Sequence, residues 1–239
     1  MSMKACIGKL AIVTVLSIVS SLTSFARLPV KTFTPGSFTA AGYEELQQTF
    51  GQKKVIPAQF REQILIALSY FPELKDLAIV FRIKHNRTPL TTIPVTTSVF
   101  KNSRNRKYII TISDSSIDML SPILLKRFSF NAQVGVLGHE LSHVSDFNHH
   151  STWGLIGNGV DHISTKWVDH FEYRTDSICI AHGLGYQLLD WSTSVRKAMH
   201  VENYDGADNV GEPMTRERYM NPSTIRKRIA SNPMYNLVA

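Results

Sequence analysis

The stretch GVLGHELSHVSDFNHH, residues 135–150, places His139, Glu140 and His143 in the spacing H-E-x-x-H. Apolar residues recur around it at intervals of three and four: Val134, Leu137, Leu141 and Val144. This period predicts an amphipathic helix that begins near Asn131 as its N-cap. His139 and His143 lie about 40° apart around such a helix, roughly opposite the apolar stripe. The helix is therefore expected to pack on one side and to present two imidazoles on the other.

Two histidines one helical turn apart can both bind one Zn²⁺, and Glu140 can then take a proton from the metal-bound water. A catalytic zinc site needs a third protein ligand. Glu172 is the first candidate, because Asp176 one turn later could accept a hydrogen bond from a ligand histidine and fix its tautomer. His149 is the alternative.

His149 follows His143 by six residues, as in the metzincin pattern H-E-x-x-H-x-x-G-x-x-H. Asp146 stands where that pattern has the glycine that turns the chain back to the metal, and Asp adopts such a backbone less readily than Gly. Both third ligands remain open at this point.

The flanking segments predict an α+β fold. Periodicity and proline positions indicate helices over 57–71 and 164–182, the second ending at Gly183, and a short helix over 221–229 with Pro222 in its first turn. Alternating apolar residues indicate strands over 77–84 and 106–113, and a third over 91–100, where Pro94 suggests an edge strand or a bulge. We expect a small mixed sheet packed on the motif helix, followed by the helix that carries Glu172.

The first 26 residues carry Lys4 and Lys9, an uncharged apolar run and small residues before a cleavage point after Ala26. This pattern is typical of a secretory signal peptide, and an uncleaved membrane anchor is the alternative. Residues 27–56 would form an N-terminal extension and residues 57–239 the single domain, located in the periplasm or secreted. Cleavage would leave Cys179 as the single cysteine, which excludes a disulfide framework.

The formal net charge is +7, and it falls by two without Lys4 and Lys9. The basic residues are scattered apart from 101–107 and 226–228, and neither run is interleaved with aromatic residues. We therefore expect no nucleic-acid partner, and interpret the charge as a solvated face or as attraction to an anionic envelope or membrane surface.

The segments HELSH and EYRTD, residues 139–143 and 172–176, resemble the gluzincin metallopeptidases, and most closely the HtpX-type family with H-E-x-x-H followed by E-x-x-A-D. The resemblance implies a zincin-like core, zinc ligands His139, His143 and Glu172, the catalytic base Glu140, and Asp176 as a partner of a ligand histidine. Thr175 stands where the family has alanine. NPSTIRKRI, residues 221–229, is similar to a C-terminal His-Pro motif but has Asn221 for the histidine.

These patterns together predict an exported zinc endopeptidase that acts on protein or peptide substrates. The strand over 106–113 is expected to pair with an extended substrate at a sheet edge. His200, Tyr204 and Tyr219 are candidate donors to the oxyanion of the reaction, and the sequence does not choose among them. A non-catalytic envelope protein with a structural zinc site is the alternative, whereas a DNA-linked protease of the SprT type conflicts with the export signal.

Overall fold

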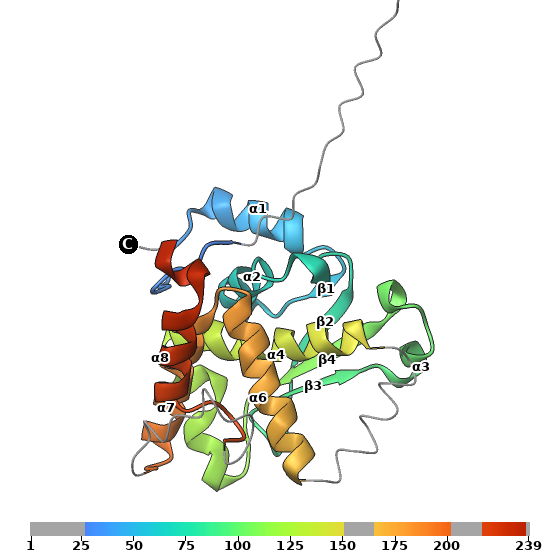
Figure 1. Cartoon of the computed structure of the whole chain (residues 1–239). Coiled ribbons are helices and arrows are strands. Elements are labelled where there is room, and N and C mark those ends of the chain that lie inside the picture. Colours follow the sequence, from blue (N-terminus) through green and yellow to red (C-terminus); the bar gives the residue numbers. More distant parts are fainter. Residues whose placement is uncertain (1–26, 151–164, 202–216, 238–239) are drawn as a thin grey trace, which may run out of the picture.

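The computed structural model describes residues 27–150, 165–201 and 217–237. Helix α4 (Phe130–His149) runs through the middle of the fold (Figure 1), and every residue from Asn131 to Phe147 is buried. The expected helix is confirmed, but Asn131 is not its N-cap. The Ser129 hydroxyl accepts a hydrogen bond from the Ala132 amide, and Asn131 lies inside the helix, where its side-chain oxygen accepts from the Phe33 amide at 2.9 Å.

The fold is α+β with a mixed four-stranded sheet in the order β1-β2-β4-β3. Strands β1 (Lys54–Val55), β2 (Ala78–Ile83) and β4 (Lys107–Ile112) are parallel, and β3 (Leu90–Pro94) pairs antiparallel with β4. Three strands match the expected segments, while β1 was not expected. The third segment is shorter than predicted because Pro94 ends the pairing and helix α3 (Thr96–Val99) follows.

Helices surround α4 on the sides that the sheet leaves open. They are α2 (Arg61–Leu68), α6 (Thr165–Ala181) and α7 (Gly185–Ala198), with α1 (Ala40–Phe50) on α2 and α8 (Pro222–Ser231) on α7 (Figure 1). Short 3₁₀ turns cover Ala58–Phe60, Pro72–Leu74, Ser103–Asn105, Asp118–Ile123, Leu125–Arg127 and Pro233–Leu237. Helix α7 was not expected from the sequence. Helix α7 covers a side of α4 that lies away from the apolar stripe and that the stripe alone would predict to face solvent.

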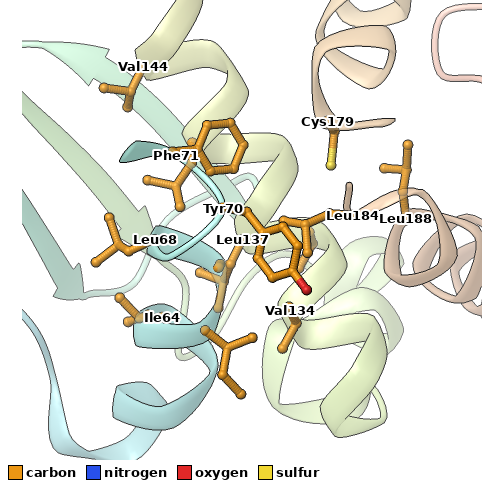
Figure 2. Packing of buried hydrophobic residues seen from close by; sticks show 14 of the residues in the cluster. Ile64, Leu68, Tyr70, Phe71, Val134, Leu137, Val144, Cys179, Leu184 and Leu188 are labelled. Atoms are coloured by element: carbon orange, nitrogen blue, oxygen red, sulfur yellow. The ribbon is translucent and has the colours of Figure 1, made fainter. Parts of the chain in front are cut away.

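The hydrophobic core has α4 at its centre. Figure 2 shows Val134 and Leu137 between Ile64 and Leu68 on one side and Leu184 and Leu188 on the other. The apolar faces of β2 and β4 join the same cluster through Ile79, Phe81, Tyr108, Ile110 and Ile112. Cys179 is fully buried there, where it packs as a small apolar residue, and burial raises the pKa of its thiol.

Residues 27–56 belong to this packing. Phe33, Tyr43 and Leu46 are buried in the core, and the Tyr70 hydroxyl donates to the Leu28 carbonyl at 3.1 Å. The expected signal segment, residues 1–26, lies outside the described residues. Within the described ranges, no helix combines the length and the apolar character that a membrane crossing requires.

Two glycines let α4 and α7 approach closely. A Cβ atom at Gly135 would lie 2.1 Å from the backbone oxygen of Gln187, and one at Gly138 would lie 2.5 Å from a side-chain carbon of Leu184. At Gly135 the obstacle is backbone, which has little freedom to move. Gly135 therefore sets the distance between the motif helix and the helix that covers it.

We predict that Gly135→Ala lowers the free energy of unfolding by about 1–3 kcal/mol, because overpacking against backbone outweighs the better helix propensity of alanine. Urea unfolding measures this. Gly42→Ala in α1 is the matched control, since its Cβ would meet the Phe38 side chain at 3.3 Å, and it should not lower the free energy of unfolding. Equal stability of Gly135→Ala and wild type would contradict the close contact of α4 and α7.

The end of α6 is fastened to the Pro72–Leu74 turn by a partly exposed ion pair. His182 Nε2 lies 3.0 Å from Glu73 Oε1, which also accepts a hydrogen bond from Ser145 of α4 at 2.7 Å. Burial alone lowers the pKa of His182, but the bond to Glu73 outweighs it and raises that pKa above 6.5. Burial likewise raises the pKa of Glu73, but the His182 and Ser145 bonds outweigh it and hold that pKa below 4.5.

This pair predicts a pH window for stability. The His182 contribution is complete below pH 6.5 and is lost as the pH rises through its raised pKa, and the Glu73 contribution is lost as the pH falls below 4.5. The stability difference between wild type and His182→Gln, measured by urea unfolding, should therefore be largest between pH 4.5 and 6.5 and shrink on either side. A difference that does not vary with pH would rule out the ion pair.

Candidate metal centre

Helix α4 brings three functional side chains to one place. His139 and His143 are one turn apart, their rings lie 4.8 Å apart at nearly a right angle, and both are less than a tenth exposed. Glu140 is 7% exposed beside them. The arrangement agrees with the helical spacing predicted from H-E-x-x-H.

Helix α6 supplies the third group. Glu172 Oε2 lies 3.2 Å from His139 Nε2 and 3.2 Å from His143 Nε2. One ligand atom from each of the three residues lies within 4.8 Å of the other two. His139, His143 and Glu172 therefore form a group that can hold a metal ion.

The remaining ring nitrogens are held by α6 as well. His139 Nδ1 lies 2.8 Å from Asp176 Oδ1, and His143 Nδ1 lies 3.1 Å from the Thr175 hydroxyl. The Thr175 hydroxyl donates its own hydrogen to the Phe171 carbonyl, so it accepts a hydrogen bond from His143 Nδ1. Both Nδ1 atoms consequently carry hydrogen, which leaves each Nε2 free to bind a cation.

The space between Glu172 Oε2 and the two Nε2 atoms favours a positive charge. Glu172 Oε2 is buried without a hydrogen-bond partner, although it faces both Nε2 atoms. Burial by itself lowers the pKa of His139, but the bonds to Asp176 and Glu172 outweigh it and raise that pKa to about 10. Burial raises the pKa of Glu172, but the two histidines outweigh it and lower that pKa. A proton or a metal cation satisfies this centre, and a metal must displace the proton.

Aromatic rings enclose both imidazoles. Phe171 stacks on His143 with ring centroids 4.8 Å apart, and Trp191 and Tyr219 lie 5.2 and 5.7 Å from His139. These walls fix the ring planes and limit access of water. Partial desolvation of the Tyr219 phenol, followed by the charges of Glu172 and Glu140, raises the pKa of Tyr219, so its hydroxyl keeps its proton.

Glu140 is held by the neighbouring sheet. The Thr92 hydroxyl of β3 donates to Glu140 Oε2 at 2.6 Å. Glu140 lies outside the group of ligand atoms. The bond leaves Glu140 Oε1 available for another proton.

Two cavities meet at these residues. One has a volume of about 490 Å³ and apolar walls from Leu120, Ile123, Val136, Trp191 and Val195. The other has a volume of about 240 Å³ and is walled by Ile93, Phe147 and Phe171. His139, Glu140 and Glu172 line both, so the cluster stands in a cleft with an apolar recess on each side. None of residues 27–56 lines either cavity.

The strand beside this cleft is β3, not the expected segment 106–113. Strand β4 is central, paired with β2 on one side and β3 on the other, so it cannot accept another strand and that prediction was wrong. The Val95 amide donates to Lys107 and the Ser113 amide to Pro89, which places the odd-numbered residues of β3 in the ladder with β4. The amide and carbonyl groups of Leu90 and Thr92 therefore point away from β4, toward an edge of the sheet at which no further strand pairs within the described ranges.

His149 does not join the group. Helix α4 continues through Asp146 without turning back, so His149 lies exposed in the last turn with its Nδ1 on the Ser145 carbonyl at 2.7 Å. Asp146 instead pairs with Arg174. The sequence offered two candidates for the third ligand, Glu172 and His149. The structure brings Glu172, and not His149, to the two histidines.

The segment Glu217–Asn221 closes the site from the C-terminal side. Asp176 accepts the Met220 amide at 2.7 Å, and the Ser192 hydroxyl donates to the Met220 carbonyl at 2.9 Å. The Asn221 side chain bonds Glu217 and Arg196, so it is turned to α7 and α8 and lines neither cavity. Among the candidate oxyanion donors, Tyr219 lines the cleft, His200 does not, and Tyr204 lies outside the described residues.

The sequence did not identify Thr175 and Thr92 as residues of the site. Thr175 was read as a small replacement for alanine, and its place three residues after Glu172 was the available signal for a partner of His143. Nothing in the sequence around Thr92 indicated a contact with Glu140, because that contact depends on how β3 lies against α4.

No protein-family model, curated protein or solved structure matches this chain.

We predict that Thr175→Val weakens the affinity for a divalent ion about 10- to 100-fold, since it removes the acceptor that orients His143 at nearly constant volume. Competition with a chromophoric chelator, using Zn²⁺ and Co²⁺ as probes, measures the affinity. Thr175→Ser keeps the hydroxyl and should stay close to wild type. Equal affinities of the valine and serine variants would show that Thr175 does not orient a ligand.

Proposed function

We propose that this protein is a zinc-dependent endopeptidase with a zincin-like core of the gluzincin, HtpX-like type, exported by its N-terminal segment. The observation that carries the proposal is the position of Glu140. It is buried, is fixed by Thr92, and borders both cavities beside a His/His/Glu group. A base at that place, next to an open strand edge, is what hydrolysis of an extended peptide requires.

His139, His143 and Glu172 would hold the metal. Two imidazoles and one carboxylate form a donor set suited to Zn²⁺, and the orphaned Oε2 of Glu172 fits a cation. When bound, zinc supplies Lewis acidity that acidifies water and polarises a carbonyl group. Asp176 and Thr175 hold the imidazoles in the required tautomers.

Glu140 accepts and then donates the proton that is transferred in the reaction. Its Oε1 takes a proton from the attacking water, and the same carboxyl group then passes it to the nitrogen that leaves. The Thr92 hydroxyl stays on Oε2 and keeps the carboxylate aimed into the cleft. The base is thus supported by the strand that would bind the substrate.

The open edge of β3 would bind the substrate backbone. Leu90 and Thr92 offer amide and carbonyl groups to an extended peptide, and such pairing is independent of the peptide's sequence. The two apolar recesses would receive side chains on either side of the bond to be cut. Proteins or peptides in an extended state are therefore the proposed substrates.

A structural metal site is the competing interpretation. Structural zinc sites take four protein ligands, whereas the group in the described part of the chain has three. A structural site also has no use for a buried carboxylate such as Glu140, which is not a ligand. Both features favour catalysis.

We predict that Glu140→Gln lowers the rate of cleavage of denatured casein at least about 100-fold without loss of zinc, because it removes the proton acceptor and keeps the side-chain shape. Cleavage is followed by release of labelled peptides, and zinc content by atomic absorption. His149→Gln is the control and should retain wild-type activity. If neither the wild type nor Glu140→Gln cleaves although both contain zinc, the structural interpretation gains the advantage.

A further inference from the structure

Peptide hydrolysis needs a donor for the carbonyl oxygen as well as a base, and this inference rests on the proposed function. When water adds to the carbonyl carbon, negative charge develops on that oxygen. A fixed hydrogen-bond donor in the cleft stabilises this charge more than it stabilises the substrate. The donor must reach the place where the two cavities meet.

Six of the described residues line both cavities: Leu90, Thr91, His139, Glu140, Glu172 and Tyr219. Apart from the metal group and the base, two of them carry a hydroxyl group. The Thr91 hydroxyl lies beside the Asn86 side chain, from which it accepts a hydrogen bond at 2.9 Å, and so is held at the segment that precedes β3. Tyr219 is 38% exposed, and its hydroxyl has no hydrogen-bond partner within the described ranges.

The backbone around Tyr219 is fixed from two helices, α6 and α7. Asp176 of α6 accepts the Met220 amide, Ser192 of α7 donates to the Met220 carbonyl, and Arg196 donates to the Tyr219 carbonyl at 3.3 Å. The Tyr219 ring packs edge-on against Trp191 with centroids 5.9 Å apart. Such a ring can act as a preorganised donor, because little conformational freedom is left to lose.

Three other polar side chains near the cleft make contacts outside it. Arg196 donates to carbonyl groups and to Asn221, and the Asn221 amide donates to Glu217. Arg218 lines one cavity, and its Nε bonds Asp169 at 2.7 Å. These contacts hold the 217–221 segment in place and leave Tyr219 facing the reaction site.

We infer that Tyr219 is a catalytic residue whose phenol donates a hydrogen bond to the substrate carbonyl oxygen as that oxygen becomes negatively charged. The water oxygen bonds to the carbonyl carbon while Glu140 takes the water proton. The carbon–nitrogen bond then breaks, and Glu140 returns the proton to the leaving nitrogen. Tyr219 keeps its proton throughout.

The test compares the full zinc-loaded protein with Tyr219→Phe on a quenched-fluorescent peptide that carries a cleavage site mapped in denatured casein. Loss of the donor should lower kcat about 100-fold and leave KM within about threefold. A phosphinic peptide of the same sequence, which mimics the tetrahedral state, should bind the variant weaker by a similar factor when binding is measured by calorimetry. Zinc content and Tm should equal those of wild type.

Tyr186→Phe is the matched control, because Tyr186 of α7 packs on Tyr235 and lines neither cavity. It should match wild type in kcat and in phosphinic-peptide affinity. Cleavage by Tyr219→Phe at the wild-type kcat, or unchanged affinity for the phosphinic peptide, would overturn the role of Tyr219 alone. Absence of cleavage by zinc-loaded wild type would overturn the proposed function and this inference with it.

Discussion

A helix that is buried along seventeen consecutive residues must find a partner for each polar side chain it carries, and this requirement organises the fold around α4. Asn131 and Gln133 near its start bind backbone groups of the residues around them, and Ser145 near its end binds Glu73. The middle turn carries His139, Glu140 and His143, whose partners come from α6 and β3. The candidate site is therefore the central part of a network that also holds the helix in the core.

The network explains why elements far apart in sequence meet at one point. Asp176 joins His139 of α4 to the Met220 amide, and so ties α6 to the start of α8. Ser192 and Arg196 of α7 fasten the same segment from the other side. Each contact either orients a ligand histidine or positions a side chain that faces the cleft. Because the bonds of Asp176 and Ser192 are buried, a change in one of them is transmitted to the site through packing.

Much of the site could be predicted from the sequence because its information is local. The H-E-x-x-H spacing and the apolar period fix three side chains on one helix, and Glu172 and Asp176 stand one turn apart on the next. The strand order could not be read in this way. Thr111 alternates with the apolar residues of β4, yet it is buried, because the Arg82 side chain of the neighbouring strand β2 covers it and donates a hydrogen bond to its hydroxyl. Helix α7 was not predicted from the sequence, because its burial depends on the close approach of α4 and α7 at Gly135.

The open edge of β3 also bears on how the protein behaves among copies of itself. Exposed strand edges invite neighbouring molecules to add strands, which is a common route to aggregation. Strand β3 spans Leu90–Pro94, and the proline that ends it has no amide hydrogen to offer. Two residues at most can donate along this edge, which makes it a poor template for a growing sheet. The shortness of β3 thus disfavours the addition of strands from other copies of the protein.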